Sequence, residues 1–352
     1  MNSTETVTYR PADRLGLQRV IGQPGLLPQQ AEKVDPSLPI ARDELLIEVE
    51  SLNIDSASFH QISEACEGDV RRIETHIQDL VSRRGKQHNP VTGSGGMLIG
   101  RVTQVGPEFP VDEKPVQVGD RIASLVSLSL TPLQIRRIRK VHPSIDRVDV
   151  EGHAILFASG LFARLPSDIT DTVALAALDV AGAPAQTRKL VQANDTVVVI
   201  GGGGKSGVLC LYEAKRKSGV RTLAIDFSPH SLARLRSLAF VDEVIQADAR
   251  NAVDIMEKVK VATGGKMADL VINVANLPET EMGSILACRQ KGIVYLFSMA
   301  TSFTRAALGA EGVGADVDLR IGNGYTEGHA DLTLDLLRES PALRELFEKT
   351  YS

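Results

Sequence analysis

The spacing of hydrophobic and polar residues changes along the chain and divides it into two parts. Residues 44–54 alternate between hydrophobic and polar, as in a strand with one buried face. In residues 56–84 hydrophobic positions recur every three or four residues and charged residues occupy the opposite face, which predicts helix. Three further strands are predicted at 98–105, 118–126 and 152–159. The first part of the chain is therefore expected to be rich in strands.

The second part alternates between short hydrophobic runs and longer helical stretches. Its predicted strands cover residues 196–200, 222–227, 243–247, 270–275, 292–299 and 318–321. Strands separated by helices favour a parallel sheet with right-handed connections, and six such strands match a doubly wound dinucleotide-binding fold. Helices are also predicted over 171–191, interrupted at Gly182 and Pro184, and over 328–351, with a break at Pro341.

The first strand of the second part runs into a glycine-rich turn. Gly202, Gly204 and Gly207 fit the pattern G-x-G-x-x-G. In this pattern one glycine allows the tight turn, one lets the backbone approach a pyrophosphate, and one allows close helix packing. The helix that begins at Lys205 and Ser206 would present free N–H groups and its positive dipole end to the phosphates. The segment is therefore typical of a dinucleotide-binding turn.

Asp226 indicates which dinucleotide is bound. It ends the next predicted strand, where a carboxylate can accept hydrogen bonds from the adenosine ribose of NAD. The same carboxylate would repel the additional phosphate of NADP, so NAD is the expected cofactor and NADP is possible. An NTPase phosphate loop is excluded because it needs a glycine where this chain has Val199. A glycine turn without any ligand remains open.

Five more residues are expected near the dinucleotide, because ligands of such sheets bind beyond the carboxyl ends of the strands. Asp248 follows the third strand and is expected near the adenine. The others lie at the ends of the fourth and fifth strands and are expected toward the nicotinamide: Asn273, Val274, Asn276 and Ser298.

Composition restricts the class of partner. At 352 residues the chain can form two domains, and 39 basic against 44 acidic residues give a net charge of −5. No basic block indicates binding to nucleic acid or to a membrane, so the expected partner is a small molecule. The N-terminus lacks the hydrophobic core of a signal peptide, and the three cysteines lie far apart without C-x-x-C spacing. A cytoplasmic location without disulfides or structural zinc is expected.

Several longer motifs carry a resemblance to a known family. They are N-I-D-S-A-S-F at 53–59, N-P-V-T-G-S-G-G-M-L-I-G at 89–100, V-x-V-G-D-R at 116–121, L-V-S-L-S-L-T-P at 125–132, A-A-L-D-V-A-G-A-P-A-Q at 176–186 and F-S-M-A-T-S-F at 297–303. V-x-V-G-D-R, together with the strand-rich first part, the glycine turn near residue 200 and the C-terminal helix, resembles the medium-chain dehydrogenase/reductase superfamily. Within it, the sequence is similar over nearly its whole length to the L-erythro-3,5-diaminohexanoate dehydrogenase family of lysine fermentation.

This resemblance implies an α/β protein with a doubly wound parallel Rossmann sheet and a β-rich, GroES-like catalytic domain. The expected domains are 1–165 with 323–352 for catalysis and 166–322 for the dinucleotide. The implied reaction is the NAD(P)-dependent oxidative deamination of 3,5-diaminohexanoate to 5-amino-3-oxohexanoate and ammonia. Related proteins pair through the last strand of the Rossmann sheet, which implies a homodimer or a dimer of dimers.

The resemblance also bears on metal binding. Zinc-dependent members of the superfamily carry ligands at the positions that hold Asp55, Gly96 and Met97 in this chain. These three residues do not form a zinc ligand set, so no catalytic metal is expected.

Oxidative deamination requires a general base, because only the free amine can release a hydride and the resulting iminium must react with an activated water. Asp55 is the first candidate for the base or for an ammonium anchor, although it could equally cap the next helix beside Ser58. Glu64 is the second candidate for binding an ammonium group, and a surface position is its alternative.

The loop after residue 84 offers groups for the substrate carboxylate. Arg84 and Lys86 could bind that carboxylate, and Asn89, Thr92 and Ser94 could donate hydrogen bonds or simply stabilise the loop. Two other functions remain open. A zinc-free quinone or enone reductase would favour NADPH and would not need groups for a carboxylate or an ammonium. A non-catalytic dinucleotide-sensing protein would bind the cofactor without turnover.

Overall fold

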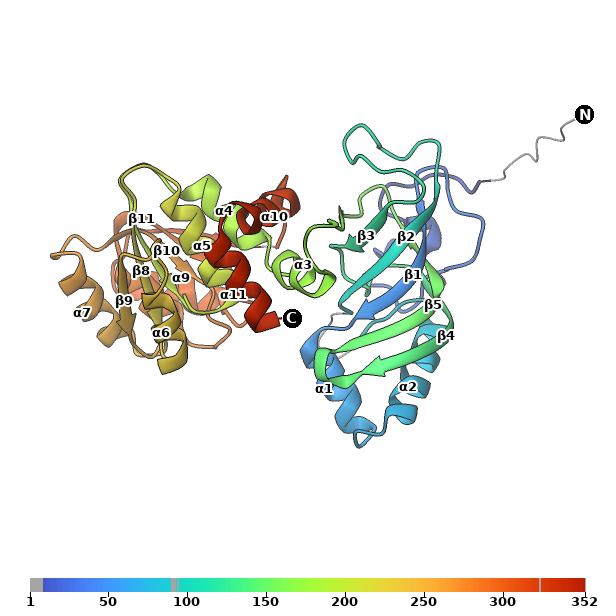
Figure 1. Ribbon diagram of the computed structural model, residues 1–352, viewed down its shortest axis with the longest axis horizontal. Coiled ribbons are helices and arrows are strands. Elements are labelled where there is room, and N and C mark those ends of the chain that lie inside the picture. The colour runs from blue at the N-terminus through green and yellow to red at the C-terminus, as the bar shows by residue number, and fades with distance from the viewer. Residues whose placement is uncertain (1–8, 90–92, 94, 323, 352) are drawn as a thin grey trace, which may run out of the picture. The chain divides into compact units, whose positions relative to one another are not determined.

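The computed structural model describes residues 9–89, 93, 95–322 and 324–351, and the chain forms two compact units (Figure 1). The first unit ends at Pro166 and the second begins at Ser167, one residue beyond the boundary expected from the sequence. Each unit has its own six-stranded sheet and its own hydrophobic core. Among the helices of the described residues, none has both the length and the hydrophobicity to cross a membrane.

The first unit is built on an antiparallel sheet with the strand order β4-β5-β1-β2-β3-β6. Its strands are β1 (Leu45–Asn53), β2 (Met97–Val105), β3 (Arg121–Ser124), β4 (Leu133–His142), β5 (Arg147–Leu156) and β6 (Phe162–Arg164). Its helices are η1 (Leu17–Arg19), α1 (Ser56–Ala65), α2 (Val70–Arg84) and η2 (Pro143–Ile145). The predicted strand-rich character of the first part is confirmed.

The single helix predicted over residues 56–84 is two helices. Gly68 adopts a left-handed φ of 71° between them, and Asp69 begins α2 by accepting a hydrogen bond from the backbone N–H of Arg72. The hydrophobic face of α2 packs on β4, with Ile73 and Ile77 fully buried. The hydrophobic face that predicted this helix is therefore the face that covers the core of the first unit.

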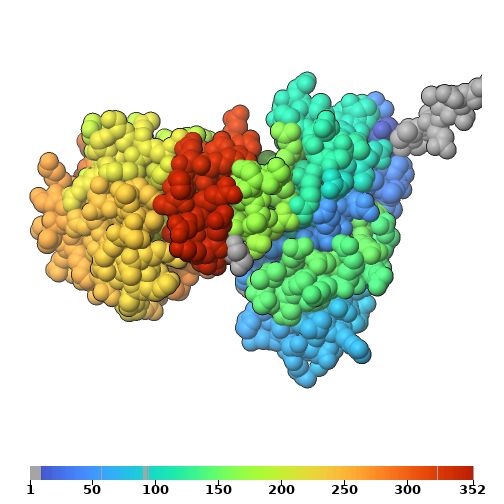
Figure 2. Space-filling model, viewed as in Figure 1, coloured from blue at the N-terminus to red at the C-terminus, as the bar shows by residue number. Residues whose placement is uncertain are grey.

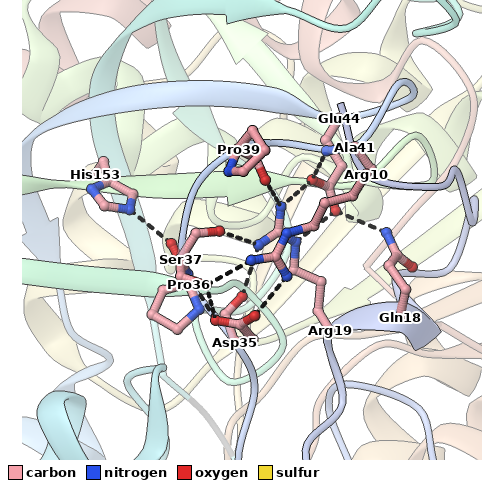
Figure 3. A network of polar contacts seen from close by, with 10 residues as sticks. All are labelled: Arg10, Gln18, Arg19, Asp35, Pro36, Ser37, Pro39, Ala41, Glu44 and His153. Carbon is pink, nitrogen blue, oxygen red and sulfur yellow. Dashed lines mark hydrogen bonds and ion pairs between the residues drawn. The ribbon is translucent and has the colours of Figure 1, made fainter. Parts of the chain in front are cut away.

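A buried ion pair anchors the chain that precedes β1 (Figure 3). Arg19 is fully buried, and its guanidinium donates to Glu44 Oε1 at 2.9 Å and to Oε2 at 2.6 Å. The same guanidinium donates to the backbone carbonyls of Asp35, Ser37 and Pro39. Because every polar edge of this cation is hydrogen-bonded inside the protein, the irregular N-terminal segment has a defined position on the first unit.

The second unit contains a parallel sheet with the strand order β12-β11-β10-β7-β8-β9. The strands are β7 (Thr196–Ile200), β8 (Arg221–Asp226), β9 (Glu243–Gln246), β10 (Ala268–Asn273), β11 (Cys288–Leu296) and β12 (Asp318–Ile321). The helices are α3 (Asp171–Leu178), α4 (Gly182–Leu190), α5 (Lys205–Lys215), α6 (Pro229–Arg236), α7 (Ala252–Ala262), α8 (Glu281–Ala287), α9 (Phe303–Gly312), α10 (His329–Glu339) and α11 (Pro341–Tyr351). This is the doubly wound order, so the predicted fold class is confirmed.

The C-terminal helices differ from the expectation. Residues 323–352 were expected to complete the first domain, but α10 and α11 pack on α3, α4 and α5 of the second unit. Figure 2 shows α10 and α11 in red on the surface of that unit. Arg338 of α10 donates to Asp168 at 3.0 Å, and Leu337 and Phe347 are fully buried. The C-terminal residues are therefore held beside the dinucleotide-binding sheet.

β12 is an edge strand of the parallel sheet. Asp318, Arg320 and Ile321 are exposed, and Ile321 retains 62% of its accessible surface. An exposed edge with a hydrophobic residue is a surface on which a second chain could pair. The homodimer expected through this strand stays a prediction.

Candidate functional site

A cavity of about 570 Å³ opens in the second unit at the carboxyl ends of β7, β8 and β10. Eight of the residues predicted to bind the dinucleotide line it: Gly204, Lys205, Ser206, Gly207, Asp226, Asp248, Val274 and Asn276. The strand ends, the turn and the start of α5 therefore meet where the doubly wound fold places its ligand.

The glycine turn joins β7 to α5 as expected, but a different glycine makes the tight turn. Gly201, rather than Gly202, takes the left-handed conformation, with a φ of 83°. A Cβ on Gly207 would lie 2.4 Å from the carbonyl oxygen of Gly201, so only glycine allows α5 to pack this closely. A Cβ on Gly204 would meet nothing nearer than 3.6 Å, which leaves the backbone open to a ligand. Gly202 does not line the cavity.

Lys205 and Ser206 begin α5 at the mouth of the turn. The first backbone N–H groups of a helix have no partner within the helix, so they are available to a pyrophosphate. Lys205 adds a cation, which lies 2.5 Å from Asp179 Oδ2 at the end of α3. The ion pair holds the side chain of Lys205, which lines the cavity.

Asp226 is fixed by backbone donors. Its Oδ2 accepts from the N–H of Gly203 at 2.9 Å, and its Oδ1 accepts from Phe227 at 2.9 Å and from Ser228 at 3.1 Å. These bonds hold the carboxylate at the end of β8, facing the cavity that it lines. A carboxylate so placed can accept hydrogen bonds from ribose hydroxyls.

The wall expected near the adenine also contains an ion pair. Asp248 accepts from Arg250 Nη2 at 2.7 Å, and both residues line the cavity. Hydrogen bonds from the Arg250 side chain and backbone lower the pKa of Asp248 to about 2. Asp248 is therefore ionised at neutral pH, and the guanidinium beside it balances its charge.

Two residues expected near the nicotinamide do not line the cavity. Asn273 is fully buried, and its Nδ2 donates to Thr280 Oγ1 and Ser284 Oγ, both at 2.8 Å. Its Oδ1 accepts from the N–H of Ala275, so every polar atom of the amide is engaged in holding β10 to α8. Ser298 Oγ accepts from the N–H of Ala300 and stabilises a turn. The prediction of cofactor contact is not supported for either residue.

Residues that sequence reasoning missed also line the cavity. They include Phe227, Ser231, Arg234 and Arg250 beyond the ends of β8 and β9, Leu277 after β10, and Thr350 and Tyr351 at the end of α11. Phe227 directly follows the predicted Asp226 and Arg250 lies two residues after the predicted Asp248, so the sequence could have indicated both positions. Thr350 and Tyr351 carry no local signal, because only the packing of α11 brings them here.

In the first unit, Asp55 follows β1 and caps α1. Its Oδ1 accepts from the backbone N–H of Ser58 at 3.0 Å. Its Oδ2 is buried and has no hydrogen-bond partner among the described residues. The capping interpretation of Asp55 is confirmed. The role of base or ammonium anchor stays a prediction, and the second oxygen is not occupied by the cap.

Two consecutive glycines bring further polar residues to Asp55. A Cβ on Gly95 would lie 2.2 Å from the backbone oxygen of Gln87, and a Cβ on Gly96 would lie 2.0 Å from that of Asn53. The backbones of Gln87 and Asn53 therefore contact two adjacent residues, Gly95 and Gly96, that directly precede β2. Asp55 follows Asn53 by two positions. These three residues carry four buried side-chain atoms without partners among the described residues: Asn53 Oδ1, Asp55 Oδ2, and Oε1 and Nε2 of Gln87.

Lys86 is placed differently from the expectation. Its side chain is fully buried, and Nζ donates to the backbone carbonyls of Pro28 at 2.7 Å and Gln29 at 3.2 Å. Burial, with a smaller contribution from the charge of Arg84, lowers the pKa of Lys86 to about 8. The ammonium is used to hold the N-terminal segment, so its predicted role as a carboxylate anchor is not supported.

The other predicted substrate residues occupy varied positions. Arg84 ends α2 with Nη1 3.4 Å from His88 Nδ1, and Asn89 Nδ2 donates to Gln61 Oε1 at 2.6 Å. Glu64 is on the exposed side of α1, where it pairs with His60 at 3.2 Å and 68% of its side chain is accessible. Ser58 is fully buried. Thr92 and Ser94 lie outside the described residues. The roles predicted for these side chains stay predictions.

Within the ranges that the structure describes, no three His, Cys, Asp or Glu side chains are grouped so as to hold a metal ion. Cys66, Cys210 and Cys288 are each buried with a free thiol.

Known proteins resemble this chain over nearly its full length. A family model for the N-terminal domain of L-erythro-3,5-diaminohexanoate dehydrogenase matches residues 18–166. The L-erythro-3,5-diaminohexanoate dehydrogenase of Acetoanaerobium sticklandii is 52% identical over 340 residues, which cover 96% of this chain and 98% of the relative. The enzyme of the same name from Fusobacterium nucleatum subsp. nucleatum is 48% identical with the same coverage.

Among solved structures, an alcohol dehydrogenase from Thermotoga maritima superposes with a TM-score of 0.55 at 15% identity, covering 89% of this chain and 88% of that one. This likeness supports the two-unit fold alone. The near full-length identity with the two dehydrogenases goes further and confirms the resemblance seen in the motifs: the chain belongs to the L-erythro-3,5-diaminohexanoate dehydrogenase family.

Proposed function

We propose that this protein catalyses the NAD-dependent oxidative deamination of L-erythro-3,5-diaminohexanoate at carbon 3. The products are 5-amino-3-oxohexanoate, an ammonium ion, NADH and a proton, and one water is consumed. The observation that carries the proposal is the 52% identity with an enzyme of this name over 340 residues. The residues of both units fit what the reaction requires.

The cavity of the second unit fits a nicotinamide dinucleotide. The open backbone at Gly204 and the first N–H groups of α5 would hold the pyrophosphate, and Asp226 would accept from the adenosine ribose. A 2′-phosphate in that place would meet the Asp226 carboxylate, so we propose NAD rather than NADP as the preferred cofactor. When bound, the oxidised nicotinamide supplies the hydride acceptor.

Asp55 is the residue best placed to act as the base. The substrate nitrogen at carbon 3 must lose a proton before its lone pair can assist the departure of the hydride. Asp55 Oδ2 can accept that proton because it is buried and unpartnered, while Oδ1 is held by the N–H of Ser58. The capping bond thus orients the carboxylate, and the free oxygen serves the substrate.

Hydrolysis of the resulting iminium requires a second proton transfer. A water that adds to carbon 3 must give up a proton, and Asp55 can accept it once its first proton has been passed on. The departing nitrogen leaves as ammonia and is protonated in water. A single carboxylate can therefore serve both stages of the reaction.

The test is a steady-state assay with L-erythro-3,5-diaminohexanoate and NAD that follows NADH and ammonia together. Equal release of both is expected from the wild-type protein, and Asp55→Asn is expected to lower kcat by about a hundredfold or more. Asparagine also caps helices well, so the fold of this variant should be retained. Asp69→Asn is the matched control, because Asp69 caps α2 with the same geometry outside the cluster.

The other two functions predict different results. A quinone or enone reductase would oxidise NADPH with an unsaturated ketone and would release no ammonia from the diamino acid. A sensing protein would bind the dinucleotide without turnover of any substrate. Activity of Asp55→Asn equal to that of Asp69→Asn would assign the base to another residue.

A further inference from the structure

We infer that Gln87 is a substrate-binding residue whose carboxamide contacts both the carboxylate and the 3-ammonium group of the diamino acid. The inference rests on the proposed function and adds to it a residue that specifies the substrate. Gln87 is not among the residues that the sequence motifs singled out.

Gln87 is in an unusual state for a buried side chain. It is fully buried, yet neither Oε1 nor Nε2 has a hydrogen-bond partner among the described residues. The buried amide of Asn273, in contrast, makes bonds to Thr280, Ser284 and Ala275. Among the described residues with unpartnered buried atoms, Gln87 is the one in which two side-chain atoms lack a partner. A buried amide that lacks partners destabilises the fold, so its presence indicates a ligand that supplies them.

The position of Gln87 identifies the site to which it belongs. Its backbone oxygen lies against Gly95, and that of Asn53 lies against Gly96, at the entry to β2. Asp55, the proposed base, follows Asn53 and has its own unpartnered oxygen. The backbone of Gln87 therefore lies at the same strand entry as that of Asn53, two residues before the proposed base, and this places the Gln87 carboxamide in our proposal at the substrate nitrogen.

The backbone that carries Gln87 is held from the preceding residue. Lys86 Nζ donates to two carbonyl groups of the N-terminal segment, at Pro28 and Gln29, and its side chain is fully buried. Because this segment is already ordered in the unbound protein, substrate binding loses no conformational entropy by ordering it. The backbone next to Gln87 is thus positioned before the substrate arrives, as suits a specific binding group.

The unsatisfied atoms match the chemistry of a β-amino acid. Asn53 Oδ1, Asp55 Oδ2 and Gln87 Oε1 are acceptors, and an alkylammonium group has three N–H donors to offer. Gln87 Nε2 is a donor that needs an acceptor, and a carboxylate provides one. In the substrate a single methylene separates the carboxylate from the carbon that bears the 3-ammonium, so one carboxamide can contact both groups.

The test replaces Gln87 with methionine, which keeps the length of the side chain and removes both polar atoms. We expect KM for the diamino acid to rise about tenfold or more, while the Kd for NADH is unchanged. The melting temperature should stay the same or rise, because the substitution removes buried groups that have no partners. A merely structural role would give the opposite change in melting temperature.

Gln78→Met is the matched control. Gln78 lies on α2 and its Nε2 donates to the carbonyl of Ile135 at 2.8 Å, so its loss should lower the melting temperature and leave KM unchanged. The inference is overturned if Gln87→Met leaves KM at the wild-type value or lowers the melting temperature as Gln78→Met does.

Direct titration with L-erythro-3,5-diaminohexanoate separates this inference from the proposed function. Wild-type binding without turnover would contradict the proposed reaction, and weaker binding by Gln87→Met would still support Gln87 as a contact. If the wild-type protein neither binds nor turns over the diamino acid, both proposals are wrong.

Discussion

The backbone N–H of Gly203 donates to Asp226 Oδ2 over 2.9 Å, so the glycine turn itself positions the carboxylate that ends β8. A Cβ on Gly203 would lie 2.8 Å from that oxygen and 2.5 Å from the Cβ of Ser231. The absence of a side chain at Gly203 therefore lets the turn and the carboxylate approach each other. The glycine turn and the carboxylate, which we propose to bind the pyrophosphate and the ribose, are therefore joined by a direct hydrogen bond.

This relationship predicts the effect of Asp226→Ser on cofactor choice. Removing the carboxylate should lower kcat/KM for NAD by about tenfold to a hundredfold, the value of one or two hydrogen bonds to a charged group. The same change should raise kcat/KM for NADP, because the 2′-phosphate no longer meets a negative charge. Initial rates with each cofactor at a saturating diamino acid concentration would measure both effects.

Asp254→Asn provides the comparison for that experiment. Asp254 lies on α7, where it pairs with Lys258, and it does not line the cavity. Its kcat/KM values should equal those of the wild-type protein for both cofactors. If Asp226→Ser keeps the wild-type ratio of NAD to NADP, the assignment of Asp226 to the ribose is wrong.

The dinucleotide half could be predicted in detail because buried parallel strands appear as continuous hydrophobic runs. β7 and β12 have the bounds that the sequence predicts. β4 was missed, since two register shifts against β5 interrupt its alternation and basic residues such as Arg136 and Arg139 occupy its outer face. The spacing of hydrophobic residues predicted α10 and α11, but it does not indicate which unit of the protein these helices pack on.

The site could be predicted only where one local motif carries it. The spacing from the glycines to Asp226 is local, and the structure places Gly204, Gly207 and Asp226 at the cavity. Asn273 shows the limit of the rule of strand ends, which gives the position of a residue but not its partners: the amide bonds to Thr280 and Ser284, and the residue does not line the cavity. Gln87 has no sequence signature at all, because a missing hydrogen-bond partner exists only in three dimensions.

The buried pair of Arg19 and Glu44 predicts a large loss of stability on breaking it. Arg19→Met should lower the free energy of unfolding by about 3–5 kcal/mol, because it leaves the Glu44 carboxylate buried without its counter-charge. Arg42→Met removes an exposed partner of Glu108, whose side chain is 50% accessible, and should cost about 1 kcal/mol or less. Urea titrations of the two variants test the difference. Equal midpoints would mean that the buried pair does not anchor the N-terminal segment.

Lys86 predicts a rise of stability with pH. Its pKa is about 8 in the folded protein and returns to about 10.5 on unfolding, so between these values the unfolded chain binds the additional proton. The free energy of unfolding should therefore gain up to about 1.4 kcal/mol per pH unit from this residue across that window, and nothing below it. Urea titrations from pH 7 to pH 10 should show a gain that Lys86→Met lacks. Lys140→Met, an exposed lysine of β4, should keep the wild-type dependence.

Tyr351 predicts that the end of α11 contributes to cofactor binding. Its ring packs on Phe347 with the centroids 5.3 Å apart, and Tyr351 lines the same cavity as Gly204 and Lys205. Tyr351→Ala should raise the Kd for NADH by about threefold to tenfold, the loss expected from removing part of a contact of this size. Fluorescence titration with NADH measures this change without any substrate.

Lys349→Ala tests whether the effect belongs to the cavity wall or to the helix. Lys349 is 74% exposed and pairs with Glu345 on the outer side of α11, so its loss should leave the Kd for NADH unchanged. Phe347→Leu should weaken NADH binding indirectly, because Phe347 is fully buried and supports the Tyr351 ring. If Tyr351→Ala binds NADH as the wild-type protein does, the C-terminal residues border the cavity without contacting the cofactor, and α11 serves only the fold of the second unit.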